Sequence, residues 1–323
     1  MDAPFFVVGC GRSGSTMLRL MLDAHPDLAV PGESHFIPPL WRRRREYERD
    51  GRLDADALAA DIAGTPHFGH WKIPPEPYLE AIRALDRPSF AEVVERAFLA
   101  NAENHGKRRW ADKTPIHVRH IELLSRLWPS ARFVHLIRDG RDVALSYLTV
   151  PWGPRTVLEA AWKWRRDVSA GRAASGALGP ERYVELRYER LVEDPRGALE
   201  ELCAFVDLPF DARMLDHARE VDRERLAPAS GLPYHARAAT PPAAGARDWR
   251  TEMSEGDAAD FEALAGRLLA DLGYPPGPRR PGLESRARAS LAAAVLAARE
   301  RAGEARKALR RGRAGGAGPP RDD

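Results

Sequence analysis

Residues 5–22 read FFVVGCGRSGSTMLRLML, and this stretch decides the fold class of the 323-residue chain. The apolar run Phe5–Gly9 is typical of a buried strand, and Thr16–Leu22 carries apolar residues in the pattern of a helix. The glycine-rich turn between them lets backbone N–H groups approach an anion at the start of the helix. The stretch therefore predicts a strand, a tight anion-binding turn and a helix.

The glycines of this turn have the spacing of a Walker A loop, because four residues separate Gly9 from Gly14. Ser15, however, stands where that motif has its lysine. Since that lysine holds the β- and γ-phosphates of a triphosphate, its absence argues against transfer of a γ-phosphoryl group. Arg12 instead places a bidentate donor beside the bound anion. We expect the whole loop to bind a phosphate group: Gly11, Arg12, Ser13, Gly14, Ser15 and Thr16.

Strand and helix signals alternate along the rest of the chain. Strands are predicted at Leu28–Val30, Arg132–Ile137 and Tyr183–Leu186, and helices at Val118–Trp128, Asp142–Leu148, Thr156–Ala174 and Pro195–Val206. Such alternation indicates an α/β fold with a mostly parallel central sheet and helices on both faces. Residues 41–105 carry Leu and Ala at helical spacing and predict a helical insertion or lid. The expected architecture is a P-loop-like three-layer fold.

The sequence predicts one catalytic domain over residues 1–275 and a basic tail over 276–323. The tail holds 12 Lys/Arg and 5 Asp/Glu, whereas residues 1–275 hold 38 and 42 and are slightly acidic. The basic balance therefore gives no reason to expect nucleic-acid binding by the folded body. A helix is predicted at Leu283–Leu309 and disorder over Gly312–Asp323. The tail helix is either a solvated extension or a contact for an anionic membrane or an acidic partner.

Compartment and metal content are also suggested by the sequence. No apolar run approaches the ~20 residues that span a bilayer, and the N-terminus lacks a basic segment of the signal-peptide kind. The two cysteines, Cys10 and Cys203, are far apart, and the ten histidines are scattered. We expect a cytoplasmic protein with reduced thiols and no metal requirement.

A second candidate anion site follows the predicted strand Arg132–Ile137. Arg138 comes at the carboxyl end of that strand, and Ser146 lies eight residues further on, in the next predicted helix. Ligands of open parallel sheets bind outside the carboxyl ends of the strands, so Arg12 and Arg138 are expected at one edge. Two anion sites in one crevice suit a nucleoside that carries phosphates at both ends. The alternative is a salt bridge from Arg138 to an aspartate of the same turn.

These two segments, in this order and about 120 residues apart, resemble the 5′-phosphosulfate loop and the 3′-phosphate motif of sulfotransferases that use 3′-phosphoadenosine 5′-phosphosulfate (PAPS). The resemblance extends from Phe5 to about Trp249 in order and spacing. The stretches Arg12–Thr16, Asp23–Pro26 and Gly32-Glu33 are similar to the tyrosylprotein sulfotransferase branch and its bacterial relatives. The resemblance implies PAPS as the sulfuryl donor.

The resemblance also implies roles for two residues in the chemistry. Glu33 matches the glutamate that serves as general base in that branch, and Lys113 matches the lysine beside the oxygen that leaves with the phosphate. With Arg12 they form the predicted catalytic set. The alternatives are a solvated loop carboxylate for Glu33 and a surface ion pair with Asp112 for Lys113. His35 is the second candidate for the base, or else a packed side chain.

Two further segments are similar to cofactor contacts of the family. Tyr188 lies in a Tyr-Glu-x-Leu segment after a predicted strand, where the family has a tyrosine near the cofactor. Trp249 and Arg250 resemble a late aromatic and basic element that closes over the 3′-phosphate and the adenine. Core packing is the alternative for the tyrosine.

Two rival functions stay open at this point. A P-loop kinase for nucleosides or other small molecules would need the missing lysine and a magnesium-binding acidic residue on a strand. A non-catalytic nucleotide-binding protein would tolerate replacement of Glu33 and Lys113. The acceptor is expected to present a hydroxyl group, as a small metabolite, a carbohydrate, a lipid or a tyrosine does.

Overall fold

A computed structural model describes residues 3–216 and 247–314. The described residues belong to two compact units: Met1–Arg138 with Arg166–Ala246, and Asp139–Arg165 with Arg247–Asp323. The division into a catalytic domain and a tail at residue 275 stays a prediction.

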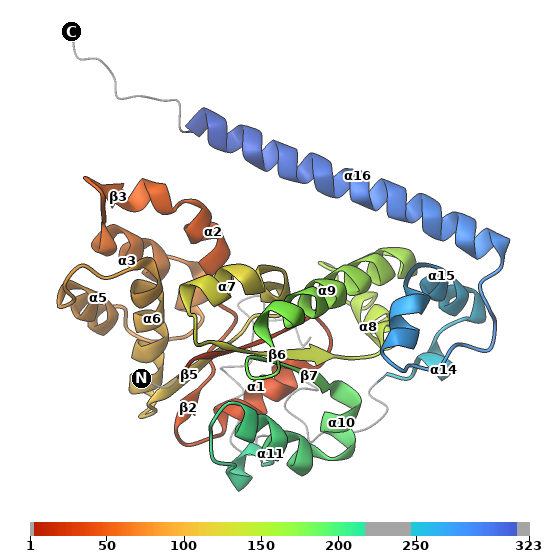
Figure 1. Ribbon diagram of the computed structural model, residues 1–323, viewed down its shortest axis with the longest axis horizontal. Coiled ribbons are helices and arrows are strands. Elements are labelled where there is room, and N and C mark those ends of the chain that lie inside the picture. The colour runs from red at the N-terminus through yellow and green to blue at the C-terminus, as the bar shows by residue number, and fades with distance from the viewer. Residues whose placement is uncertain (1–2, 217–246, 315–323) are drawn as a thin grey trace. The chain divides into compact units, whose positions relative to one another are not determined.

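The first unit is built on a five-stranded parallel sheet (Figure 1). Its strands, in spatial order, are β2 (Leu28–Ala29), β5 (Arg109–Lys113), β1 (Phe5–Gly9), β6 (Arg132–Ile137) and β7 (Tyr183–Arg187). Every neighbouring pair runs parallel, with Phe5 opposite both Ala111 and Arg132 on the two sides of β1. The predicted α/β class with a mostly parallel sheet is therefore confirmed.

Strand β1 lies at the centre of the sheet, and all five of its residues are buried. Its side chains alternate between two apolar clusters, as the period of a strand requires. Phe6 and Val8 pack with helices of the segment 36–104, whereas Phe5 and Val7 pack with α1 (Ser15–Asp23) and α11 (Pro195–Phe205). Helices therefore cover both faces of the sheet and give the unit three layers.

The segment predicted as a helical insertion is helical for most of its length. It contains α2 (Ile37–Arg42), η1 (Arg44–Tyr47), the hairpin of β3 (Glu48–Arg49) and β4 (Arg52–Leu53), α3 (Ala55–Ala63), α4 (Pro66–Gly69), α5 (Glu76–Arg83) and α6 (Phe90–Asn104). Helix α6 begins with a capping box between Ser89 and Glu92. The segment packs into the same cluster as Phe6, and its role as a lid stays a prediction.

Two of the remaining helices of the first unit, η2 (Pro115–His120) and α7 (Ile121–Leu127), connect β5 to β6. Two others, α10 (Tyr188–Glu193) and η3 (Ala212–Met214), follow β7. The long helix α9 (Val157–Leu178) contributes residues to both units.

The second unit contains α8 (Gly140–Tyr147), α14 (Trp249–Glu252), α15 (Glu255–Asp271) and α16 (Leu283–Ala314). Its main polar contact is the fully buried Arg141, which forms ion pairs with Asp139 and Glu262, each at 2.7 Å. The guanidinium carbon of Arg141 also lies 3.6 Å from the centre of the Trp249 ring. The arginine thus joins α8, α14 and α15 within this unit.

Three sequence predictions need correction. Strand β5, whose residues read RWADK, was not predicted, because its charged residues interrupt the apolar pattern by which strands are recognised. The helix expected at Val118–Trp128 is η2 followed by α7, since Pro115 opens a tighter turn first. Helix α16 extends to Ala314, so disorder from Gly312 is wrong for its first three residues, and 315–323 lie outside the described residues.

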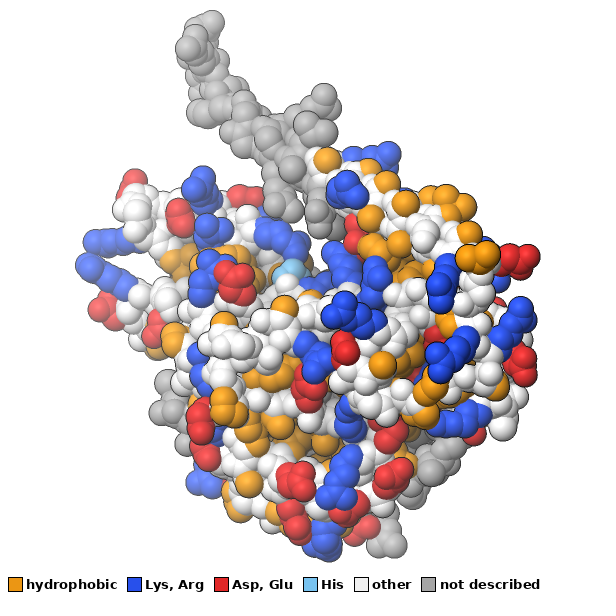
Figure 2. Space-filling view, turned by 45° about the vertical axis from the view of Figure 1, so that its right-hand side comes forward, with side chains coloured by type: hydrophobic (Ala, Val, Ile, Leu, Met, Phe, Trp, Pro, Cys, Tyr) orange, Lys and Arg blue, Asp and Glu red, His pale blue; other side chains and the backbone are white. Residues whose placement is uncertain are grey.

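Acidic and basic side chains share the face drawn in the space-filling view, with hydrophobic ones between them (Figure 2). Among the described residues, no helix has the length and apolar character that a membrane span requires. The loop predicted at residues 227–247 lies almost entirely outside the described residues.

Candidate active site

The carboxyl ends of all five strands meet at one edge of the sheet, because every neighbouring pair is parallel. Lys113 is the last residue of β5, and Arg138 and Tyr188 directly follow β6 and β7. Arg12 lies three residues after β1, and Glu33 four residues after β2. The predicted placement of Arg12 and Arg138 at a common edge is confirmed. The missed strand β5 brings Lys113 to the same edge.

The loop from Gly9 to Gly14 has the backbone of an anion-binding turn. Gly9, Arg12 and Gly14 all have positive φ angles, of 153°, 71° and 91°. Gly14 is the N-cap of α1 and supplies no side-chain oxygen to the helix. The first N–H groups of α1 therefore lie where an anion is stabilised by the helix dipole.

Ser13 adds a buried hydroxyl to this loop. Its side chain is 1% exposed, and its Oγ has no hydrogen-bond partner among the residues that the structure describes. A buried hydroxyl without a partner is costly unless a ligand satisfies it. Ser15 is also buried, and Thr16 is half-buried. This part of the loop fits a phosphate or sulfate oxygen.

Tyr188 connects the loop with Arg138. The Arg138 guanidinium carbon lies 4.4 Å from the centre of the Tyr188 ring, in a cation–π contact. A Cβ atom placed on Gly14 would overlap the same ring. The structure therefore brings together the phosphate loop, Arg138 and Tyr188. Since Arg138 is only 6% exposed, this cation is desolvated, which strengthens its attraction for an anion.

Glu33 and Lys113 form an ion pair at the other end of the same edge. Lys113 Nζ donates to Glu33 Oε1 at 2.5 Å, and His35 Nε2 donates to Glu33 Oε2 at 2.7 Å. Lys113 is 3% exposed, whereas the side chain of Glu33 remains one-third exposed. The proposed base and the proposed cation for the leaving oxygen are therefore in direct contact.

The electrostatics of this pair favour the charged carboxylate. Burial by itself raises the pKa of Glu33, but the Lys113 ammonium and the hydrogen bonds from His35 and Lys113 outweigh it and hold that pKa well below its usual range. Burial lowers the pKa of Lys113, and the attraction of Glu33 opposes that change. Glu33 is thus ionised over the whole neutral range.

Two alternative interpretations from the sequence are wrong. Lys113 is buried and does not form a surface ion pair with Asp112, because Asp112 accepts hydrogen bonds from Thr114 and His117, at 2.9 Å and 2.7 Å. Glu33 is not a freely solvated loop carboxylate, since both of its oxygens accept hydrogen bonds.

A buried polar network joins the turn of Glu33 to the end of β5. The Ser34 backbone N–H donates to Thr114 Oγ1 at 2.9 Å, and Thr114 in turn donates to Asp112. All three side chains are at most 1% exposed. Since Lys113 lies between Asp112 and Thr114, this network fixes the spacing of Glu33 and Lys113.

The other predicted cofactor contacts lie in the second unit. Ser146 is half-buried on α8. Trp249 is 3% exposed, and its backbone N–H donates to Asp142 Oδ1 at 2.8 Å. Arg250 pairs with Asp248 at 3.5 Å. Their contacts with the cofactor stay predictions.

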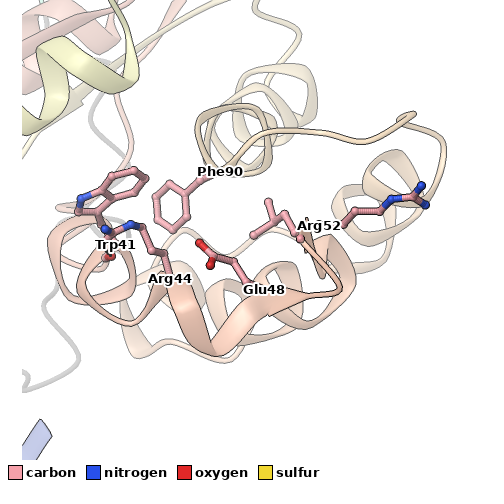
Figure 3. Close-up of a pocket in the computed structure, with 7 residues that line it drawn as sticks. Trp41, Arg44, Glu48, Arg52 and Phe90 are labelled. Atoms are coloured by element: carbon pink, nitrogen blue, oxygen red, sulfur yellow. Dashed lines mark hydrogen bonds between the residues drawn. The ribbon is translucent and has the colours of Figure 1, made fainter. Parts of the chain in front are cut away.

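A small hollow lies on the helical segment that follows Glu33 (Figure 3). It has a volume of about 420 Å³ and is lined by Trp41, Arg44, Glu48, Gly51, Arg52, Leu53 and Phe90. Trp41 packs edge to face against Phe90, and the Arg44 guanidinium lies over the Trp41 ring. Within the described ranges 3–216 and 247–314, no cluster of three His, Cys, Asp or Glu side chains is arranged to hold a metal ion.

Comparison with known proteins shows the family to which the chain belongs. The model of the sulfotransferase family matches residues 4–212 of the chain, which include the loop, Glu33, Lys113, Arg138 and Tyr188. The chain belongs to the sulfotransferase family. The predicted family, fold and enzyme class are thereby confirmed.

The individual relatives and solved structures share about a quarter of their residues with this chain. Protein-tyrosine sulfotransferase A of Caenorhabditis elegans is 24% identical over 294 residues, which are 86% of this chain and 69% of that protein. Human protein-tyrosine sulfotransferase 1 is 24% identical over 69% of the chain, and the match spans 56% of the human protein. The sulfotransferase domain of the Synechococcus PCC 7002 olefin synthase is 25% identical, with a TM-score of 0.61, over 85% of this chain and 97% of that domain.

The close contact of Gly14 with Tyr188 leads to a test of the loop. Gly14→Ala places a Cβ against the ring at a φ of 91°, so we expect the free energy of unfolding to fall by about 1–3 kcal/mol in urea titrations. Gly176→Ala is the matched control, because Gly176 lies in helix α9 with open space around it. Its free energy of unfolding should rise by up to about 1 kcal/mol, since alanine favours a helix over glycine. Equal effects of the two changes would contradict the close packing of the loop.

Proposed function

We propose that this chain transfers the sulfuryl group of PAPS to a hydroxyl group of an acceptor. The observation that carries the proposal is the single sheet edge that holds the phosphate loop, Lys113 and Glu33. The loop supplies an anion site, Lys113 a buried cation, and Glu33 an ionised carboxylate. Sulfuryl transfer needs these three functions together.

The donor end of the proposed site consists of the loop and Arg138. When bound, PAPS supplies an electrophilic sulfuryl group on a phosphate leaving group. Residues 11–16 surround its 5′ end through backbone N–H groups, the Ser13 hydroxyl and Arg12. Arg138, which stacks on Tyr188, binds the 3′-phosphate. Ser146, Trp249 and Arg250 are proposed to complete this end.

The chemical step follows from the ion pair of Glu33 and Lys113. Glu33 accepts the acceptor's hydroxyl proton at a carboxylate oxygen while the acceptor oxygen bonds to sulfur. Lys113 donates a hydrogen bond to the bridging oxygen as the bond between that oxygen and sulfur breaks. The contact of Lys113 Nζ with Glu33 Oε1 holds the two groups together in the resting site. The bridging oxygen of an anionic donor competes for the same ammonium, so Lys113 turns from Glu33 to the donor before the acceptor reacts.

The proposed acceptor is a small metabolite, a carbohydrate, a lipid or a tyrosine, each of which presents a hydroxyl to Glu33. The hollow beside Trp41, with its apolar wall and charged groups, is proposed to receive the non-reacting part of the acceptor. Helix α2, which carries Trp41, begins four residues after Glu33. A cytoplasmic location is part of the proposal, and so is contact of the basic helix α16 with an anionic membrane or an acidic partner.

The proposed donor leads to a prediction about ligand choice. Isothermal titration calorimetry of the full chain in chelator should show binding of 3′-phosphoadenosine 5′-phosphate (PAP), with little heat from ATP. The loop has no lysine for a γ-phosphate, whereas two arginines follow neighbouring strands. Arg138→Met should weaken PAP binding about 10-fold or more, because it removes a charge-assisted contact. Binding of ATP with magnesium in preference to PAP would favour the rival kinase.

A further prediction concerns the base. Glu33→Gln should lower turnover of PAPS, with the best hydroxyl acceptor of a panel, by about 10²- to 10⁴-fold. PAP affinity should stay within a few-fold of the parent, because the loop and Arg138 are unchanged. Glu122→Gln is the matched control, since the side chain of Glu122 is 90% exposed. Parent-like turnover in Glu33→Gln would show that Glu33 is not the base and would agree with a non-catalytic role of the pair.

A further inference from the structure

The turn that carries Glu33 holds His35 in an unusual conformation. His35 has a φ of 45°, in the left-handed region that only a few per cent of non-glycine residues adopt, most often asparagine, aspartate and histidine. In this conformation its Nε2 lies 2.7 Å from Glu33 Oε2. Because an ionised carboxylate can only accept, the hydrogen of this bond belongs to His35. A strained residue at such a place is commonly maintained for function.

The surroundings of the turn hold this conformation in place. On one side, Ser34 is fixed to Thr114 by the buried network that continues to Asp112 and His117. On the other side, the His35 ring packs against His67 of α4, with ring centres 4.8 Å apart. These contacts restrain His35 beside Glu33, and its side chain remains 37% exposed.

We propose that His35 is the positioning residue of the base: it keeps Glu33 ionised and correctly oriented after Lys113 has turned to the leaving oxygen. This inference rests on the proposed function, because it assigns a task within the same reaction. In this proposal the two carboxylate oxygens of Glu33 have different roles. Oε1, which Lys113 vacates, takes the acceptor's proton, and Oε2 stays on His35.

The need for such a residue follows from the electrostatics. Burial raises the pKa of Glu33, and the attraction of Lys113 is the largest opposing effect. Once Lys113 bonds to another oxygen, its hydrogen bond to Glu33 is lost, whereas the hydrogen bond from His35 still favours the carboxylate form. The charged and titratable groups that act on the pair, besides His35, are Arg19 from α1, Asp112 from β5 and His67 from α4.

The test compares two substitutions of His35. His35→Gly removes the donor while adopting a positive φ without strain, and His35→Gln retains an N–H donor at a similar reach. In His35→Gly, kcat should fall about 10- to 100-fold with little change in the KM for PAPS, as for loss of a hydrogen bond to a charged group. The pKa of Glu33 should rise, so the acidic limb of the pH–kcat profile should move to higher pH by about one unit. His35→Gln should recover most of both effects.

A control and an independent readout complete the test. His105→Ala should leave the profile unchanged, because His105 bonds to the Asn101 carbonyl oxygen on the amino-terminal side of β5. Carboxyl ¹³C NMR of Glu33 in Lys113→Met should show a higher pKa when His35→Gly is added. This readout needs no donor and no turnover, so its failure is distinguishable from failure of the proposed function.

Two results would overturn the inference. In the first, both His35 variants lose the same activity while the acidic limb stays in place, which is the behaviour of a purely structural residue. In the second, the Glu33 titration in Lys113→Met does not respond to His35→Gly. Absence of PAP binding by the parent chain would instead refute the proposed donor and leave the NMR result to decide the role of His35.

Discussion

The parallel pairing of five strands is the constraint on which the site depends. Each strand contributes at most a few residues to the chemistry, and none of these residues is close in sequence to all the others. Parallel alignment around the buried strand β1 brings the five carboxyl ends to one edge. The loop, Lys113, Glu33, Arg138 and Tyr188 thus meet because of the topology. The apolar clusters on both faces of β1 stabilise this arrangement.

The ion pair between Glu33 and Lys113 gives the site a resting state. Their contact lowers the cost of burying a lysine that is 3% exposed, since a buried charge without a partner is strongly unfavourable. It also holds together the two groups that the reaction uses. In the proposed mechanism an anionic donor competes with Glu33 for the same ammonium, so the site becomes active as the donor enters.

Much of the fold was predictable because its signals are local. The loop, strand β6 at Arg132–Ile137 and the placement of Arg138 followed from apolar runs and glycine spacing. Strand β5 was missed because its ends are charged, although the strand is largely buried. The bonds of Glu33 to Lys113 and His35 could not be predicted, since they depend on the pairing of β2 with β5 and on one strained turn. A positive φ at a histidine has no sequence signal.

The most direct test is a crystal structure of the full chain with PAP. The account predicts that the 5′-phosphate lies within hydrogen-bond distance of residues 11–16 and of Lys113 Nζ, and the 3′-phosphate within reach of Arg138. It also predicts that Lys113 has left Glu33 Oε1, while His35 Nε2 still donates to Oε2. PAP bound away from this sheet edge, or an unchanged contact between Lys113 and Glu33 beneath a bound PAP, would contradict it.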